Sequence, residues 1–358
     1  MSRRPCIVLG ASGLVGQRLQ QRLIDHPFFE LKAVSGSKQT AGKPLIEVDW
    51  RLEQDRPNLP DIEVLDIDSN DFISTLKALE IEVAFSALPN EIALAIESKL
   101  ANSGILVFSN SSANRRKKGI PLVIPEINQE QLNNSSKGIF CATNCTLLPI
   151  ALPLSAICQK FGFSHVKIRS KQALSGAGWR LLHDQEALNG IHDRHISGEA
   201  EKINEELIHI FAQANHNDIS SANFTTDIEC ERVSRKDGHL VVVEITTKET
   251  ISIEEVNQAI VNFNANFSLN SAPSSPIKPI HLVDKVDTEK HLWSDGVTFT
   301  SLPNPSQDLK TGMAIVVGDI EVYEGNTLRF NAYSHNTIRG AAGGVILLAE
   351  LIAMKTLV

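Results

Sequence analysis

Short apolar runs alternate with longer segments of helical periodicity through the first 110 residues. The apolar runs lie at 6–9, 31–34, 62–65, 83–85 and 105–108. Helical spacing follows the first run up to Asp25, with Leu14, Leu19 and Leu23 on one side, and it recurs over 91–101. Strands that alternate with helices form a parallel sheet covered on both faces. The pattern therefore predicts the architecture of a dinucleotide-binding domain.

The second half of the chain has a different pattern, in which apolar and polar residues alternate along the predicted strands. These strands lie at 166–174, 240–248, 314–320 and 328–333, and helices are predicted over 198–213 and 253–267. This combination predicts a mostly antiparallel sheet with helices on one face. A last helix, about 336–354, is apolar enough to pack back onto the first domain.

Length and composition fit this division into two domains. A chain of 358 residues is too long for one ordinary core. We therefore predict an α/β protein with a Rossmann-type parallel-sheet domain, 1–144 with 336–358, and an α+β domain, 145–335. With 42% hydrophobic residues and a net charge of −8, the chain resembles a globular protein without a nucleic-acid surface.

The lengths of the apolar runs, the N-terminal residues and the cysteine count indicate the cellular compartment. Its apolar runs are too short to span a membrane, and the start Met-Ser-Arg-Arg-Pro leads into a strand without a signal-peptide core. Five cysteines, an odd number, fit a reducing cytoplasm better than a disulfide framework. We expect a cytoplasmic protein with neither a membrane nor a nucleic-acid partner.

A glycine-rich turn follows the first strand directly. Gly10, Gly13 and Gly16 are spaced G-x-x-G-x-x-G, a variant of the dinucleotide fingerprint. The cofactor contacts predicted for this turn are Gly10, Ser12, Gly13, Leu14 and Val15. At the end of the second strand the chain offers Ser37 and Lys38, with no carboxylate before Glu47. A hydroxyl and a cation suit a 2′-phosphate, so we predict NADP rather than NAD.

A cysteine stands where an extended run, Phe140 to Thr143, gives way to a predicted helix over 146–158. At a helix start, free N–H groups and the positive end of the helix dipole favour thiolate over thiol. Cys145, in Asn144-Cys145-Thr146, is therefore a candidate nucleophile.

These features together resemble the aspartate-semialdehyde dehydrogenase family, in its archaeal and fungal-type branch. The matching segments are Gly10–Gly16, Ser109–Arg115, Pro121–Glu126, Asn144–Thr146, Gln172–Gly178, Ile196–Lys202, Arg232 with Asp237–His239, and His335–Gly343. Each segment is weak alone, but their order and spacing together are specific. Two departures are Gln39, where relatives often carry an arginine against the NADP phosphate, and the run Trp179–His183.

The resemblance implies roles for the candidate catalytic residues. Cys145 corresponds to the nucleophile that forms a thioester. His239, seven positions after Arg232, corresponds to the general acid/base. Gln172 matches the glutamine beside substrate and nucleophile, and Asn144 is expected to steady the oxyanion.

The resemblance also implies how a multiply charged substrate, aspartyl phosphate or the semialdehyde with phosphate, is held. Arg115 corresponds to the phosphate-binding arginine and Arg232 to the one that holds the carboxylate. Glu199 is expected to hold the α-amino group and Lys202 to help hold the phosphate. The further cofactor contacts implied are Ser86, Ser175, Gly176 and Asn336. Family members are homodimers or homotetramers, so we expect one of these assemblies.

Two alternatives to an NADP-dependent aspartate-semialdehyde dehydrogenase remain open. One is a related reductase for another activated acid, acetylglutamyl phosphate or malonyl-CoA, although Glu199 suits a substrate with a free amino group. The other is a non-catalytic, NADP-binding redox sensor, which has no need of Arg115 or Arg232. His192 and His195 lie a turn apart, but no third ligand accompanies them, so we predict no metal site.

Overall fold

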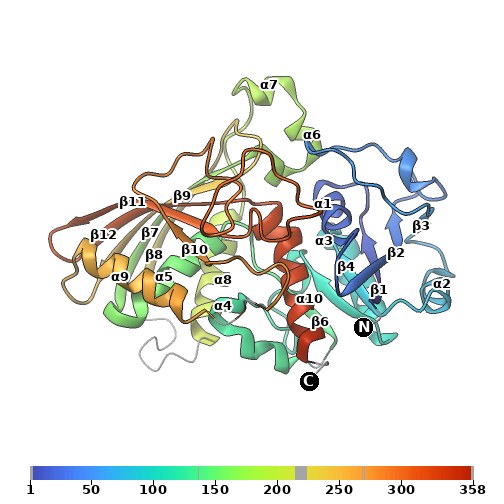
Figure 1. Ribbon diagram of the computed structural model, residues 1–358, viewed down its shortest axis with the longest axis horizontal. Coiled ribbons are helices and arrows are strands. Elements are labelled where there is room, and N and C mark those ends of the chain that lie inside the picture. Colours follow the sequence, from blue (N-terminus) through green and yellow to red (C-terminus); the bar gives the residue numbers. More distant parts are fainter. Residues whose placement is uncertain (1–2, 136, 214–223, 268, 270, 356–358) are drawn as a thin grey trace.

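The computed structural model describes residues 3–135, 137–213, 224–267, 269 and 271–355. Two six-stranded sheets lie on either side of the molecule, with the last helix between them (Figure 1). Among the described residues, none of the helices combines the length and apolarity needed to cross a membrane.

The first sheet is entirely parallel, as the alternating pattern predicts. Its strands are β1 (Arg4–Leu9), β2 (Phe29–Gly36), β3 (Val64–Asp66), β4 (Val83–Ser86), β5 (Leu106–Ser109) and β6 (Ile139–Cys141), in the order β3-β2-β1-β4-β5-β6. The connections include α1 (Leu14–Leu23), α2 (Phe72–Ala78), α3 (Asn90–Asn102), α4 (Pro125–Asn128), and the 3₁₀ turns η1 (Leu45–Glu47), η2 (Ser112–Asn114) and η3 (Gln129–Asn134). This Rossmann-type arrangement confirms the predicted fold of the N-terminal part.

The strand order reverses between β1 and β4, which is where open α/β sheets bind their ligands. The ends of these strands are joined, because the Ala87 N–H donates to the Leu9 carbonyl at 3.1 Å. The glycine turn after β1 and Ser86 at the end of β4 therefore share one crevice edge.

The second sheet is mixed. Its strands are β7 (Phe163–Gln172), β8 (Thr225–Arg232), β9 (His239–Thr247), β10 (Ile280–Leu282), β11 (Ile315–Tyr323) and β12 (Thr327–Ser334), in the order β10-β11-β12-β9-β7-β8. The three central pairings are antiparallel and the two outer ones are parallel. Helices α5 (Leu148–Phe161), α8 (Glu199–Gln213) and α9 (Ile253–Ala265) pack against it. The prediction of a mostly antiparallel sheet is confirmed.

The C-terminal segment returns to the first sheet. After β12, the π-helical segment η5 (Ile338–Ala342) leads into α10 (Gly343–Lys355), so the predicted start of this helix at Asn336 was too early. Helix α10 is apolar on nearly all sides and almost completely buried. Val345 and Ile346 join a core cluster with Phe85 and Phe108 of the first sheet. The division of the chain at 144/145 and 335/336 stays a prediction.

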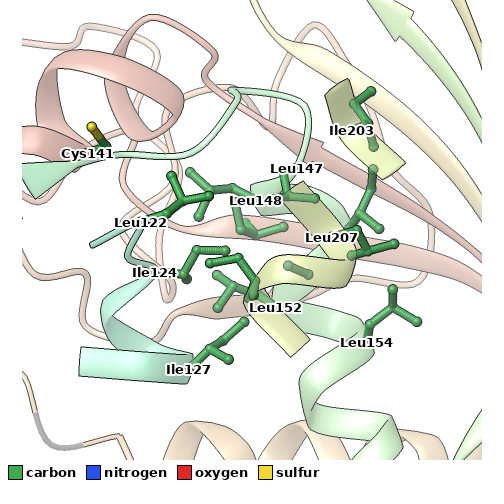
Figure 2. Packing of buried hydrophobic residues seen from close by; sticks show 14 of the residues in the cluster. Leu122, Ile124, Ile127, Cys141, Leu147, Leu148, Leu152, Leu154, Ile203 and Leu207 are labelled. Carbon is green, nitrogen blue, oxygen red and sulfur yellow. The ribbon is translucent and has the colours of Figure 1, made fainter. Parts of the chain in front are cut away.

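The chain just after Cys145 is anchored in a second apolar cluster. Leu147 and Leu148 point toward Ile203 and Leu207 of α8 and toward Leu122 (Figure 2). All five side chains are buried. Because these side chains are buried together, the position of the Cys145 turn is fixed with respect to α8.

Candidate active site

Cys145 is the first residue of the turn that precedes helix α5. The Leu147 N–H donates to the Asn144 carbonyl at 3.0 Å, and α5 begins only at Leu148. The predicted helix start at Thr146 is thus corrected by two residues. The Asn144 side chain accepts a 2.7 Å hydrogen bond from the Thr146 N–H, so it takes up one of the free donors of this turn.

Gly340 packs directly against the nucleophile. A methyl group at this position would lie 2.6 Å from the Cys145 Cβ, which is closer than two carbon atoms can approach. Its neighbour Arg339 donates to both carboxylate oxygens of Glu126 at 2.7 Å, and both side chains are buried. The motifs that contain these residues were visible in the sequence, but their role as a support for Cys145 was not.

His239 faces the thiol from the first position of β9. Its Nε2 lies 3.3 Å from the Cys145 Sγ. The Ala173 backbone nitrogen lies 3.1 Å from Nδ1, and a hydrogen bond with the Gly238 backbone raises the pKa of the ring. Nε2 is the ring nitrogen placed to exchange a proton with the sulfur. Gly176 closes over the imidazole, because an added Cβ would lie 3.1 Å from its Cε1.

The charge state of the thiol differs from the sequence-based expectation. Desolvation by burial and, to a smaller extent, the Glu199 carboxylate together raise the pKa of Cys145 to about 12. Arg115, a Thr146 hydrogen bond and Arg232 act in the opposite direction but do not prevail. The predicted preference for thiolate was wrong, because desolvation outweighs the hydrogen bond and the positive charges around the sulfur.

The imidazole is also neutral at rest. Burial, with smaller contributions from the charges of Arg232 and Arg235, lowers the pKa of His239 to about 3. The resting pair is therefore a thiol beside a neutral imidazole. A proton can pass from the thiol to the imidazole during a reaction, while the resting site contains no buried pair of charges at these two groups.

Glu199 is hydrogen-bonded to two other predicted site residues, Asn144 and Gln172. Its Oε1 accepts from the Asn144 side-chain amide at 2.9 Å and from the Gln172 amide at 3.1 Å. The Gln172 amide nitrogen thus donates to Glu199 and to the Ser170 hydroxyl, and the Gln172 carbonyl oxygen is the group left for a ligand. Lys202, three residues further along α8, has an exposed side chain. The expected pairing of Glu199 and Lys202 within one site is not seen.

Glu206 is a site residue that the sequence reading missed. Its Oε1 accepts from Arg115 Nη1 at 2.7 Å, and its Oε2 accepts from the Asn144 backbone N–H at 2.6 Å. Glu206 lies seven residues after Glu199, so both occupy one face of α8. That two-turn spacing was the available signal.

The predicted phosphate-binding arginine is buried, whereas residues 116–118 after it are exposed. Arg115 Nη2 donates to the Asn110 carbonyl at 2.8 Å. Its Nε is buried without a partner among the described residues. Arg232, at the end of β8, donates from Nη1 to the Ala173 carbonyl at 2.7 Å and lies beside Gly176.

The glycine turn fits a dinucleotide. Gly10 has a φ of +83°, and a Cβ at Gly16 would lie 2.1 Å from the Gly10 carbonyl oxygen. Among the described residues, the buried hydroxyls of Ser35 and Ser86 lack a hydrogen-bond partner. A cofactor bound in this crevice would supply hydrogen-bond partners for these two hydroxyls, which lie at the ends of β2 and β4.

The other predicted cofactor contacts lie around the same edge or near the thiol. Ser12, Gly13 and Val15 are partly exposed, Leu14 is buried, and Ser37 and Lys38 are exposed after β2. Asn336 donates to the Ser175 Oγ at 2.8 Å and accepts from the Gly238 N–H at 2.8 Å. Asn336 therefore connects the Ser175 turn to the residue that precedes His239.

No cluster of metal-ligating side chains occurs within the described part of the chain. His192 Nε2 lies 3.3 Å from the Arg232 carbonyl oxygen, and His195 forms a β-bridge with Glu231. These two histidines support the strand that ends at Arg232.

A Rossmann-type domain joined to a second domain with a thiol–imidazole pair and two buried arginines indicates a dinucleotide-dependent enzyme, with Cys145 as its candidate nucleophile. Comparison with known proteins agrees. The family model described as semialdehyde dehydrogenase, NAD binding domain, matches residues 6–135, and the corresponding dimerisation domain matches residues 154–339. The chain belongs to the semialdehyde dehydrogenase family.

Individual relatives are similar over nearly the whole chain. The aspartate-semialdehyde dehydrogenase of Methanothermobacter thermautotrophicus is 34% identical, over 96% of this chain and 97% of its own. A malonyl CoA reductase (NADP) of Metallosphaera sedula is 30% identical, over 97% and 96%. The crystal structure of aspartate semialdehyde dehydrogenase with NADP from Candida albicans has a TM-score of 0.78 and 27% identity, over the full length of both chains.

Proposed function

We propose that this chain is an NADP-dependent aspartate-semialdehyde dehydrogenase, which converts L-4-aspartyl phosphate into L-aspartate 4-semialdehyde and phosphate. The observation that carries the proposal is the 3.3 Å contact between Cys145 and His239, with the buried Arg115 and Arg232 nearby. A sulfur nucleophile beside a proton carrier and two guanidinium groups suits an acyl phosphate that also bears a carboxylate.

Substrate binding uses the donors that the protein leaves free. Arg115, fixed by Glu206, receives the phosphate, and Arg232, fixed by the Ala173 carbonyl, receives the α-carboxylate. Glu199 receives the α-amino group. Lys202, exposed in the structure, adds its charge to the phosphate when the side chain turns inward.

The Cys145 sulfur then forms a bond to the acyl carbon, and the bond from that carbon to the phosphate oxygen breaks. The thiol proton passes to His239, whose protonated ring the Gly238 backbone supports. The second N–H of the Asn144 side-chain amide donates to the reacting carbonyl, and the Gln172 carbonyl oxygen accepts a hydrogen bond from the substrate. When the C–S bond later breaks, His239 returns its proton to the products.

The cofactor, in its reduced form NADPH, would supply the hydride that reduces the thioester carbon. The residues proposed to hold it are those of the glycine turn, with Ser37 and Lys38 at the 2′-phosphate and Ser86, Ser175, Gly176 and Asn336 along the crevice. Ser175 is linked through Asn336 to Gly238, the residue before His239, which supports the proposal that this turn contacts the reacting end of the cofactor.

The test is an assay with aspartate semialdehyde, phosphate and either NADP or NAD. Wild-type protein is expected to reduce NADP in a phosphate-dependent manner. Cys145→Ala is expected to lose turnover and still bind NADP in a calorimetric titration. Phosphate-dependent turnover by that variant at the wild-type rate would refute the mechanism. NADP binding without turnover by the wild type would favour the redox-sensor alternative.

Malonyl-CoA reduction is the second candidate, because one relative of similar identity carries that name. A coenzyme A thioester needs no phosphate leaving group and no partner for an α-amino group. Glu199, buried and fixed by Asn144 and Gln172, therefore favours the amino-acid substrate. Parallel assays with malonyl-CoA and NADPH separate the two.

We further propose a homodimer or homotetramer in the cytoplasm. The family's second domain is described as a dimerisation domain, and all five cysteines of this chain are free thiols. Free thiols suit a reducing compartment. Light scattering of the purified protein determines the assembly.

A further inference from the structure

An arginine and a tryptophan outside the recognised motifs meet beside the glycine turn. Arg51 lies in the long connection between β2 and β3, and Trp179 begins the short helix α6 (Trp179–Leu182), which follows the 3₁₀ turn η4 (Leu174–Ala177) and precedes α7 (Gln185–Leu188). The Arg51 guanidinium carbon is 3.7 Å from the Trp179 ring centroid. We propose that Arg51, supported by Trp179, binds the pyrophosphate of NADP. This inference rests on the proposed use of NADP.

Arg51 is fixed to the glycine turn itself. Its Nη1 donates to the Ser12 carbonyl at 2.6 Å. Its backbone N–H donates to Gln17 Oε1 at 2.8 Å, and Gln17 Nε2 donates to the Asp49 carbonyl at 2.6 Å. The guanidinium is thus attached to the first turns of α1, where the pyrophosphate of a dinucleotide binds, and not to the end of β2, where the 2′-phosphate binds.

The face of the Trp179 ring packs against the Arg51 guanidinium. A stacked guanidinium keeps its N–H groups at the edge. Ser12 uses one of them, and Nη2 faces the exposed Asp49 carboxylate at 3.8 Å, a weak surface ion pair that a bound anion can displace. The contact also joins the two domains, because His183 Nε2 lies 3.0 Å from the Arg51 carbonyl oxygen. Leu14 and Leu182 pack beside the tryptophan in the same small cluster. The position of Arg51 is therefore set from both sides of the cofactor crevice.

The local charges suit an anion. Burial lowers the pKa of Arg51, the exposed Asp49 opposes this effect, and the nearby Arg180 lowers the pKa further. The Arg180 guanidinium carbon lies 5.1 Å from the same tryptophan ring. Two like charges near one ring repel each other, and a diphosphate between them would relieve that repulsion. The glycine turn contains no charged side chain, so Arg51 supplies the charge that the turn lacks.

The test is the dissociation constant of NADP and of NAD, measured by calorimetry for Arg51→Gln. Both cofactors contain the pyrophosphate, so both are expected to bind about tenfold more weakly, the equivalent of one charge-assisted hydrogen bond. Lys38→Gln is expected to weaken NADP only. Trp179→Leu, which removes the support and keeps Arg51, is expected to weaken both cofactors by a smaller factor.

Arg56→Gln is the matched control. Arg56 lies in the same connection, 5.6 Å from the Trp50 ring centroid, and donates to the Val48 carbonyl at 3.1 Å. It has the same kind of environment away from the glycine turn, so its replacement is expected to leave both dissociation constants unchanged. The melting temperature of each cofactor-free variant shows whether it folds.

Three results would overturn the inference. They are unchanged affinity in Arg51→Gln, loss of NADP affinity alone, which would assign Arg51 to the 2′-phosphate, and an equal loss in Arg56→Gln, which would indicate general loosening of the segment. Failure of the wild type to bind any dinucleotide would instead refute the proposed function.

Discussion

The carboxylate of Glu206 accepts a 2.7 Å hydrogen bond from the guanidinium of Arg115, 91 positions earlier in the chain, and both side chains are buried. The other oxygen of the same carboxylate accepts from the Asn144 N–H, one residue before the thiol. The proposed phosphate site and the nucleophile turn therefore share a single anchor on α8.

Removal of that anchor is expected to be costly. Glu206→Ala leaves the buried Arg115 without its counter-charge, so we expect the free energy of unfolding to fall by about 3–5 kcal/mol. The neighbouring Glu205 pairs with Arg116 on the surface, and Glu205→Ala is expected to cost less than about 1 kcal/mol. Urea unfolding of the two variants measures the difference, and equal losses would contradict the buried anchor.

The reactivity of Cys145 is expected to increase with pH well beyond the usual range of a thiol. Its pKa of about 12 predicts that alkylation by iodoacetamide still accelerates above pH 10. Because the Glu199 charge raises this pKa, Glu199→Gln is expected to shift the profile to lower pH. Mass spectrometry of the Cys145 peptide gives the rates, and the exposed Glu201→Gln is the control. A plateau near pH 8 in the wild type would refute the desolvated thiol.

Gly340 is expected to tolerate no side chain. In Gly340→Ala the new methyl group would overlap the Cys145 Cβ, so the nucleophile turn has to move. We expect turnover to fall by at least about 100-fold, since a displacement of about 1 Å at a reacting group has that effect. The unfolding free energy is expected to fall by about 1–3 kcal/mol. Steady-state kinetics and urea unfolding measure the two effects, and wild-type turnover would show that Gly340 does not position Cys145.

The free energy of unfolding is expected to fall as the pH is lowered below about 6.5, because His239 is buried and neutral in the folded protein. Its pKa is about 3 when folded and about 6.5 when unfolded, so below pH 6.5 the unfolded chain takes up a proton that the folded chain does not. Between pH 7.5 and pH 5 this group alone is expected to remove about 2 kcal/mol. The loss over this interval should be smaller by that amount in His239→Gln, as measured by urea unfolding at both pH values. An identical loss in the variant would contradict the buried, neutral imidazole.

The local patterns of the chain predicted most of the first sheet and the central strands of the second, but not β8, β10 or α2. The parallel first sheet follows from apolar runs separated by helical spacing, and the glycine turn follows from three glycines directly after a strand. The family motifs identified Cys145, His239, Arg115 and Arg232 as one set, and the structure places the first two in contact. Lys202 was expected in the same set, yet its side chain is exposed.

The sequence by itself determined the two kinds of sheet and the family, and it singled out Cys145 as the candidate nucleophile, because periodicity and motif spacing are properties of neighbouring residues. Only the tertiary structure decided that Glu206 joins Arg115 to Asn144, that Gly340 packs on Cys145, and that Arg51 lies on Trp179. It also decided the charge state of the thiol. Contacts between distant positions and the desolvation of a buried group depend on how the chain folds, and no local pattern records them.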